Sequence, residues 1–296
     1  MLNRKLNVET FLGCDKEYEE SRIVLYGAPF DSTTSYRPGT RLASRTMRAE
    51  SYGLETYSPY QDLDLEEAAV FDGGDLELPF GAPETALEML EKEAAEILAD
   101  KKLPFMIGGE HLVSLAPIRA AFRKYPDLHI IHFDAHTDLR DEYLGVKLSH
   151  ASVIRRAWDL VGDGHIHQFG IRSGERAEWY WALKDGHTEI QKFDFAGLEQ
   201  TVASLKGKPV YFTIDLDVLD PSVFPGTGTP EAGGVNFQQL LSAALLVCRD
   251  CAVVGCDLVE LSPPLDASGA STAVALKLLR EMLLCLERPF LRPDVV

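Results

Sequence analysis

The chain has 296 residues, of which 46% are hydrophobic and 25% charged, and its formal net charge is −17. These values are those of an ordinary globular protein, and they exclude a disordered chain, a collagen-like repeat and a disulfide scaffold. The sequence holds no tract of Lys and Arg that could displace counterions, so it argues against a nucleic-acid partner. The acidic charge also favours a cationic ligand over an anionic one.

The sequence contains no recognisable targeting or membrane segment. Residues 1–10 lack the apolar stretch of a secretory signal, and no window approaches the roughly 18–20 apolar residues that a membrane span needs. We therefore expect a cytoplasmic protein without a membrane partner. Among five cysteines, Cys248 and Cys251 form a C-x-x-C without a second pair, so we expect reduced, packed thiols rather than a zinc or redox site.

Short apolar runs with the composition of strands recur along the chain. In order they are residues 22–26, 68–71, 103–107, 129–133, 166–171, 189–193, 210–214 and 252–258. Segments of helical period lie at 83–101, 236–248 and 271–286. In the first of them, Leu87, Leu90 and Ala94 recur at spacings of three and four residues and define one apolar helix face.

This alternation predicts βαβ units, and hence a mostly parallel sheet with helices on both faces. No linker divides the chain, so we expect a single α/β domain over residues 1–296. In such sheets the ligand site lies beyond the carboxyl ends of the strands, so polar residues that directly follow a predicted strand are the first candidates for function. Asp72 and Asp75 also follow a predicted strand, but acids beside two glycines are expected to cap a turn.

Three predicted strand ends carry residues with metal-binding chemistry. They are Gly108-Gly109-Glu110-His111 after 103–107, Asp134-Ala135-His136-Thr137-Asp138 after 129–133, and Asp215-Leu216-Asp217 after 210–214. Side chains two positions apart share a face of an extended backbone, so the acids and the histidine within each segment can converge.

Such a group of buried carboxylates requires cations, because like charges raise each other's pKa and desolvation is unfavourable. An oxygen-rich ligand set with a minority of imidazoles suits Mn²⁺ better than structural Zn²⁺. Two divalent ions about 3.5–4 Å apart would hold a bridging water and lower its pKa toward neutrality. The residues therefore predict a two-metal hydrolytic site.

The same segments resemble a known family. Residues 107–111, 132–138 and 213–221 are similar to the three metal signatures of the ureohydrolases, the arginase–agmatinase family. Further segments that agree with this family are 35–40, 148–155, 225–234 and 257–266. Taken together and in order, these motifs are closest to those of bacterial agmatinases.

This resemblance implies a three-layer α/β/α fold around a parallel sheet of eight strands, which is also the number of strand-like runs in the sequence. It implies two Mn²⁺ per chain, with two carboxylates bridging them. The ligands carried over by motif are His111, Asp134, Asp138 and Asp215 for one ion, and His136, Asp134, Asp215 and Asp217 for the other.

The resemblance also implies a mechanism. A hydroxide that bridges the metals attacks the guanidinium carbon, and the tetrahedral intermediate collapses to urea and a primary amine. Asp138 takes part as a catalytic ligand. His150 occupies the family's proton-shuttle position, which suits a group that titrates near neutral pH. Glu260 is expected to pair with the substrate guanidinium through parallel hydrogen bonds.

Agmatine hydrolysis to putrescine and urea is the activity that this resemblance favours. Guanidinobutyrase, arginase and a catalytically silent metal-binding relative remain open, whereas a fold-related one-zinc deacetylase is disfavoured by the two sets of acids. The family commonly forms trimers or hexamers, so we expect a homo-oligomer. Two segments depart from the family pattern: Ala151-Ser152-Val153, beside the shuttle position, and Leu42-Ala43-Ser44, near an expected subunit boundary.

Overall fold

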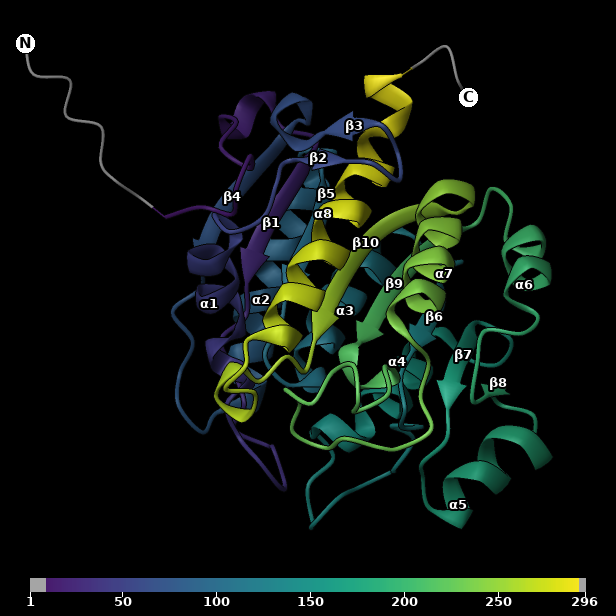
Figure 1. Cartoon of the computed structure of the whole chain (residues 1–296). Helices are drawn as coiled ribbons and strands as arrows, with labels where there is room; N and C mark the ends of the chain where they lie inside the picture. The colour runs from purple at the N-terminus through teal and green to yellow at the C-terminus, as the bar shows by residue number, and fades with distance from the viewer. Residues whose placement is uncertain (1–8, 293–296) are drawn as a thin grey trace, which may run out of the picture.

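Eight parallel strands form one sheet at the centre of the computed structural model, which describes residues 9–292. The strands are β1 (Ile23–Gly27), β4 (Val70–Asp75), β5 (Leu103–Ile107), β6 (His129–Phe133), β7 (Ile166–Ile171), β8 (Glu189–Lys192), β9 (Pro209–Asp215) and β10 (Ala252–Val259). Their order across the sheet is β4-β1-β5-β10-β9-β6-β7-β8, and all neighbours are parallel (Figure 1). The predicted eight-stranded parallel sheet is thus confirmed. Strands β2 (Tyr57–Ser58) and β3 (Leu63–Asp64) form a separate antiparallel pair.

Helices cover both faces of the sheet, which gives the three-layer arrangement. One face packs against α1 (Ala43–Ser51), α6 (Leu198–Ser204), α7 (Phe237–Asp250) and α8 (Ala270–Leu291). The other packs against α2 (Pro83–Ala99), α3 (Leu115–Lys124) and α4 (Val153–Val161). A one-turn helix, α5 (Arg176–Trp179), lies between β7 and β8. Among the described residues, no helix combines the length and the apolar character needed to cross a membrane.

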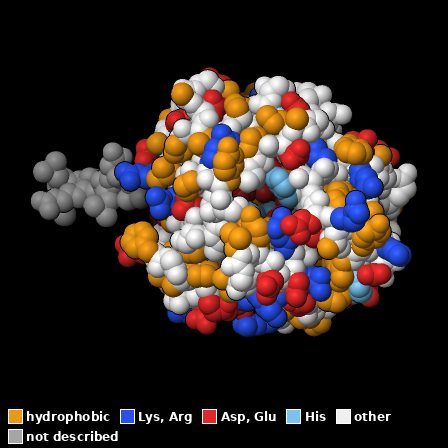
Figure 2. Space-filling model, turned by 90° about the horizontal axis from the view of Figure 1, so that it is seen from below, with side chains coloured by type: hydrophobic (Ala, Val, Ile, Leu, Met, Phe, Trp, Pro, Cys, Tyr) orange, Lys and Arg blue, Asp and Glu red, His pale blue; other side chains and the backbone are white. Residues whose placement is uncertain are grey.

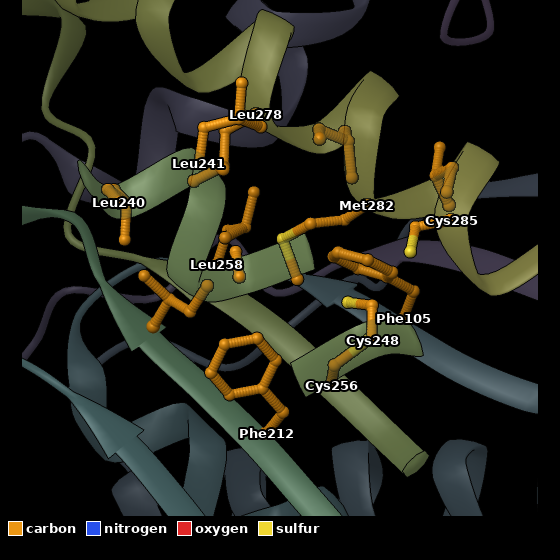
Figure 3. Close-up of a cluster of buried hydrophobic side chains, with 14 of the residues drawn as sticks. Phe105, Phe212, Leu240, Leu241, Cys248, Cys256, Leu258, Leu278, Met282 and Cys285 are labelled. Carbon is orange, nitrogen blue, oxygen red and sulfur yellow. The ribbon is translucent and has the colours of Figure 1, made fainter. Parts of the chain in front are cut away.

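The alternation of side chains along each strand builds two separate cores. In β1, Ile23 and Leu25 belong to the core beneath α7 and α8, whereas Val24 and Tyr26 belong to the core beneath α2 and α3. This explains why the strands are continuous apolar runs in the sequence, because both of their faces are buried. Figure 3 shows part of the first core, where Phe212 of β9 lies among apolar side chains of α7, α8 and neighbouring strands.

The cysteines of this core are free thiols. Cys248 of α7, Cys256 of β10 and Cys285 of α8 are buried among its apolar residues (Figure 3). Cys251 is half-buried and is also free, so the C-x-x-C segment forms no disulfide. Burial raises the pKa of the Cys248 thiol well above its usual value, which leaves it protonated and unreactive. The expectation of reduced, packed thiols agrees with this arrangement.

The strand order determines where a site can form. Strands β5, β10, β9 and β6 lie side by side in the middle of the sheet, although they are far apart in the sequence. Their carboxyl ends point to the lower side of the molecule in Figure 1. The loops that follow these four strands therefore meet over the centre of the sheet.

Candidate active site

The residues that follow these central strands surround one cavity. It has a volume of about 360 Å³, and its walls include His111, His136, Asp138, His150, Asp215 and Glu260. Figure 2 shows the molecule from this side, with a histidine visible in a central hollow and acidic side chains next to it. The structure thus brings together predicted site residues from β5, β6, β9 and β10 and from the segment before α4.

His111, which follows β5, faces three carboxylates with one ring nitrogen. Its Nδ1 lies 3.1 Å from Asp134 Oδ2, 3.1 Å from Asp138 Oδ2 and 3.4 Å from Asp215 Oδ2. This nitrogen is fully buried and makes no hydrogen bond. The other ring nitrogen, Nε2, lies 3.0 Å from Thr213 Oγ1, which itself donates to Asp257 over 2.7 Å. This chain places the ring proton on Nε2 and leaves a lone pair on Nδ1.

His136 stands in a similar arrangement on the other side of Asp134. Its Nδ1 lies 3.0 Å from Asp217 Oδ2 and 3.5 Å from Asp134 Oδ1. Backbone amides orient the acids, since Ala135 N donates to Asp217 Oδ1 over 3.1 Å and Asp217 N donates to Asp215 Oδ1 over 2.8 Å. Asp134 therefore lies between the two imidazoles and faces both.

Two of the predicted residues have an unusual backbone conformation. Asp138 has φ of 53° and Glu260 has φ of 66°, in a region that non-glycine residues rarely adopt. Such a conformation costs of order 1–3 kcal/mol and persists where surrounding contacts enforce it. For Glu260 these contacts are visible: its amide donates to Gly109 O over 3.0 Å, and its Oε1 accepts the His111 amide over 2.8 Å. Both carboxyl groups line the cavity as a result.

The charges of this cluster are not balanced by the protein alone. Burial raises the pKa of Asp138 to about 7 and the pKa values of Asp215 and Glu260 well above their usual values. Burial acts on Asp134 as well, but His132, His111 and His136 outweigh it and hold the pKa of that carboxyl well below its usual value. A carboxylate cluster with an unbonded, buried imidazole nitrogen fits divalent cations, whose charge would stabilise all these lone pairs.

His150 lies at the wall of the cavity, at the start of the turn His150–Ser152. Its Nδ1 donates to Thr33 O over 2.9 Å, which leaves Nε2 as an acceptor 3.2 Å from Ser35 Oγ. Burial lowers the pKa of this imidazole to about 4, so it is neutral at pH 7. This pKa lies below the near-neutral titration expected from the sequence, because burial disfavours the charged ring.

Sequence reasoning gave no role to His132, which the structure places directly beneath Asp134. Its Nε2 lies 2.8 Å from Asp134 Oδ2, and Gln168 Nε2 lies 3.0 Å from its Nδ1. The amide of Gln168 thus holds the ring so that its proton points at the carboxylate. The available signal was position, since His132 and Asp134 are two residues apart and share a face of the strand.

Glu110, which directly precedes His111, is fully buried and accepts hydrogen bonds from Thr33 and Thr34. It accepts the Thr33 amide over 3.0 Å, the Thr33 hydroxyl over 2.7 Å and the Thr34 hydroxyl over 2.9 Å. Burial raises its pKa to about 7. Because Thr33 in turn contacts His150, Glu110 positions that histidine through the loop.

The two segments that depart from the family pattern occupy different places. Ala151 lines the cavity beside His150, while Ser152 is buried and its hydroxyl donates to Lys147 O over 2.8 Å. The second departure begins at Leu42, which is 44% exposed. Only the first departure therefore borders the candidate site.

The chain is similar to several known proteins over most of its length. Residues 21–285 match the family model described as the arginase family. The chain is 48% identical to an agmatinase of Bacillus subtilis, over 93% of this chain and 96% of that protein. It is 36% identical to a guanidinobutyrase of Pseudomonas aeruginosa, over 87% and 84%. The crystal structure of an agmatine ureohydrolase of Thermoplasma volcanium superposes with a TM-score of 0.89 and 32% identity, covering 98% of both chains. The chain belongs to the arginase family and is an agmatinase-like ureohydrolase.

Proposed function

We propose that the protein is an agmatinase, which hydrolyses agmatine to putrescine and urea with two Mn²⁺ per chain. The observation that carries the proposal is that buried carboxylates converge on His111 Nδ1, which makes no hydrogen bond, and on His136 Nδ1. The residues that would hold the ions are His111, Asp134, His136, Asp138, Asp215 and Asp217. Bound Mn²⁺ would supply the activation of a water molecule that attacks the guanidinium carbon.

Glu260 is suited to bind the guanidinium group. One of its oxygens accepts the His111 amide, and its side chain lines the cavity, so the other oxygen can accept a substrate N–H. A carboxylate fixed in this way orients the planar guanidinium next to the cluster. His150, with its proton on Nδ1, can accept a proton at Nε2 and pass it to the departing amine.

The charges of the cavity favour a substrate that carries no carboxylate. The acidic residues Asp138, Glu175, Glu178, Asp215 and Glu260 line the cavity, whereas Arg140 is the one Lys or Arg among its walls. Arg140 lies 3.0 Å from Glu175, so its charge is already paired. A dication such as agmatine is therefore favoured over guanidinobutyrate or arginine, whose carboxylates would face this acidic wall.

The test is urea release by the Mn²⁺-loaded protein with agmatine, arginine and guanidinobutyrate compared side by side. We expect urea from agmatine at a much higher kcat/KM than from the other two. Urea released mainly from guanidinobutyrate would identify that compound as the substrate and would leave the proposed type of reaction unchanged. No urea from any of the three, with two metals bound, would contradict the proposed function.

Matched variants test the assignment of the metal residues. Asp134→Ala is expected to lose both Mn²⁺ and all urea release, because this carboxylate faces both imidazoles. Asp194→Ala removes an exposed aspartate and serves as the control, with two Mn²⁺ and full activity retained. His150→Asn is expected to lower kcat while both metals stay bound. Loss of metal in this third variant would contradict the proton-transfer role.

A further inference from the structure

A second group of metal-ligating side chains lies at the opposite end of the sheet from the cavity. Asp127 and His129 stand at the amino end of β6, and His165 directly precedes β7, so the two neighbouring strands start at this group. His129 and Asp134 are separated by five residues of extended chain, which places the group about 16 Å from the cluster beneath the cavity. The proposed reaction uses none of these three residues.

The ligand atoms of this group are close enough to share one ion. Asp127 Oδ1 lies 3.5 Å from His165 Nε2 and 4.0 Å from His129 Nε2, and all three atoms lie within 4.8 Å of one another. A tetrahedral Zn²⁺ with bonds of about 2.0–2.2 Å requires ligand atoms separated by about 3.3–3.6 Å. Asp127 and His165 already have this separation, and a small rotation of the exposed Asp127 side chain would bring it closer to His129.

The hydrogen bonds of the two histidines leave the required nitrogens free as acceptors. His165 Nδ1 donates to Asp163 O over 2.9 Å, which leaves the lone pair on Nε2. His129 Nδ1 lies 3.3 Å from His167 Nε2, and His167 Nδ1 lies 2.7 Å from Glu189 Oε2. The carboxylate of Glu189 holds a proton on His167 Nδ1, so His167 Nε2 accepts from His129 Nδ1. The Nε2 lone pair of His129 therefore also faces Asp127, in the pattern of metal-bound histidines.

A positive charge already occupies this position. The Lys208 ammonium lies 3.2 Å from Asp127 Oδ2 and 3.3 Å from His129 Nε2. The lysine side chain is 42% exposed and has a flexible stem, so it can swing into solvent when another cation binds. Burial, together with the adjacent Lys208 ammonium and the neighbouring imidazoles, lowers the pKa of His129 to about 4, which keeps its ring neutral and able to ligate at pH 7.

We propose that Asp127, His129 and His165 form a second metal site, which binds a transition-metal dication such as Zn²⁺ in exchange for the Lys208 ammonium. Two imidazoles and one carboxylate are the ligands that Zn²⁺ prefers among those without sulfur, and the exposed side of the group leaves a fourth position for water. An ion there would link the amino ends of β6 and β7. The ion would stabilise the sheet at the end opposite the cavity.

The experiment counts metal in the Mn²⁺-loaded protein after equilibration with Zn²⁺. The sum of Mn²⁺ and Zn²⁺ per chain is measured by plasma mass spectrometry, so that exchange in the cavity does not affect the count. We expect the unchanged protein to hold one ion per chain more than His165→Gln. His187→Gln is the matched control, because His187 is 24% exposed against 28% for His165 and lies outside the group. It is expected to keep the extra ion.

Two further variants keep the proposal testable if His165→Gln folds poorly. Asp127→Asn changes a side chain that is 61% exposed, and it is expected to lose the same ion. Lys208→Met removes the competing ammonium, so it is expected to bind Zn²⁺ more tightly. Equal metal counts in the unchanged protein, His165→Gln and Asp127→Asn would overturn the proposal. An anomalous zinc peak confined to the cavity in a Zn²⁺-soaked crystal would overturn it as well.

Discussion

The two ring nitrogens of His111 have different partners, and this difference decides what the residue can do. Nε2 is bonded to Thr213, while Nδ1 faces three aspartates without a hydrogen bond. A histidine fixed in this way cannot neutralise the acids by donating from Nδ1 unless it takes up a second proton. Either a second proton or a metal ion at Nδ1 would stabilise this arrangement, and a divalent ion would neutralise more of the surrounding carboxylate charge, which is how a single residue points to a metal.

Glu110 is a second single residue on which the site depends, because its carboxylate holds the loop of Thr33 and Thr34. Replacing it with Gln puts an N–H₂ group opposite donors that now face a carboxylate, so the loop and with it His150 should shift. We expect Glu110→Gln to lower kcat by up to about 100-fold, the effect of a displacement near 1 Å. The free energy of unfolding should fall by about 1–3 kcal/mol.

The readout that identifies a positioning role for Glu110 is a loss of kcat with both metals retained. Glu110→Asp keeps the charge and should recover most of the activity. If Glu110→Gln instead releases metal, the residue supports His111 rather than His150. Steady-state kinetics combined with a metal count separates these outcomes.

Contacts between neighbouring strands support the site at the scale of whole elements. Thr213 of β9 lies between His111, after β5, and Asp257 of β10, so three adjacent strands meet in one hydrogen-bonded chain. Thr213→Val keeps the shape of the side chain and removes both bonds. We expect a 10- to 100-fold loss of Mn²⁺ affinity, roughly the effect of removing such a supporting bond. Isothermal titration with Mn²⁺ measures this, and unchanged affinity would show that the chain does not orient His111.

A buried ion pair joins α1 to β4 at the edge of the sheet. Arg48 Nε lies 2.8 Å from Asp72 Oδ2, and a second nitrogen of the same side chain contacts Asp75. Arg48→Met would leave Asp72 buried without its partner, so the free energy of unfolding should fall by about 3–5 kcal/mol. Arg48→Lys keeps the charge and should lose less. A change below about 1 kcal/mol in urea denaturation for Arg48→Met would contradict this reading of the pair.

The ion pair of Arg48 also explains why the extent of one strand was not predicted from the sequence. The run at 103–107 and those at 129–133 and 166–171 have the bounds of β5, β6 and β7, because strands buried on both faces are continuous apolar runs with clear ends. The strand predicted at 68–71 is β4, which begins at Val70 and continues to Asp75. Asp72 accepts the Gly74 amide over 3.0 Å, as a capping acid would, but it does so at a register irregularity within the strand rather than in a separate turn. Asp72 and Asp75 are compatible with a strand because Arg48 of α1 neutralises their charges. Arg48 lies on another element, so the local sequence pattern around the two acids does not reveal it.

The residues of the site likewise divide into those that a local sequence pattern predicts and those that depend on contacts between distant segments. The residues at the strand ends could be found because parallel strands bring their carboxyl ends together, and the motifs fix the spacing. The supports Gln168 and Glu110 were missed, since each acts on a segment whose proximity depends on the folded sheet. His132 was missed although its spacing from Asp134 gave a local signal. Short elements such as β2 and β3 were also absent from the prediction, because two residues carry no periodic signal.

At the scale of the whole molecule, the sheet concentrates acidic groups at one end in a chain that already carries a net charge of −17. Without metal, burial raises the pKa values of Asp138, Asp215 and Glu260, so these groups hold more protons in the folded state than in the unfolded state. Their contribution to stability is complete below the ordinary carboxyl pKa and is lost as the pH rises through the raised values.

The two cluster histidines act in the same direction. Burial opposes protonation of His111 and His136, but the neighbouring aspartates outweigh it and raise both pKa values well above the ordinary value, so this stability is also lost as the pH rises. Asp134 acts in the opposite direction, since its lowered pKa contributes stability above the ordinary carboxyl value. His132 and His150 also act in the opposite direction below the ordinary histidine pKa, because burial lowers their pKa values. Because the raised pKa values of Asp138, Asp215, Glu260, His111 and His136 outnumber these lowered ones, the metal-free protein should become less stable with increasing pH.

We therefore expect the Tm of the EDTA-treated protein to fall between about pH 5 and about pH 8, while that of the Mn²⁺-loaded protein changes little. Bound cations replace the protons of the cluster, so the difference in Tm between the two forms should widen as the pH rises. Differential scanning calorimetry of both forms across this range measures the difference. A gap that stays constant or narrows with increasing pH would show that the buried carboxylates and imidazoles are not the groups that the metals stabilise.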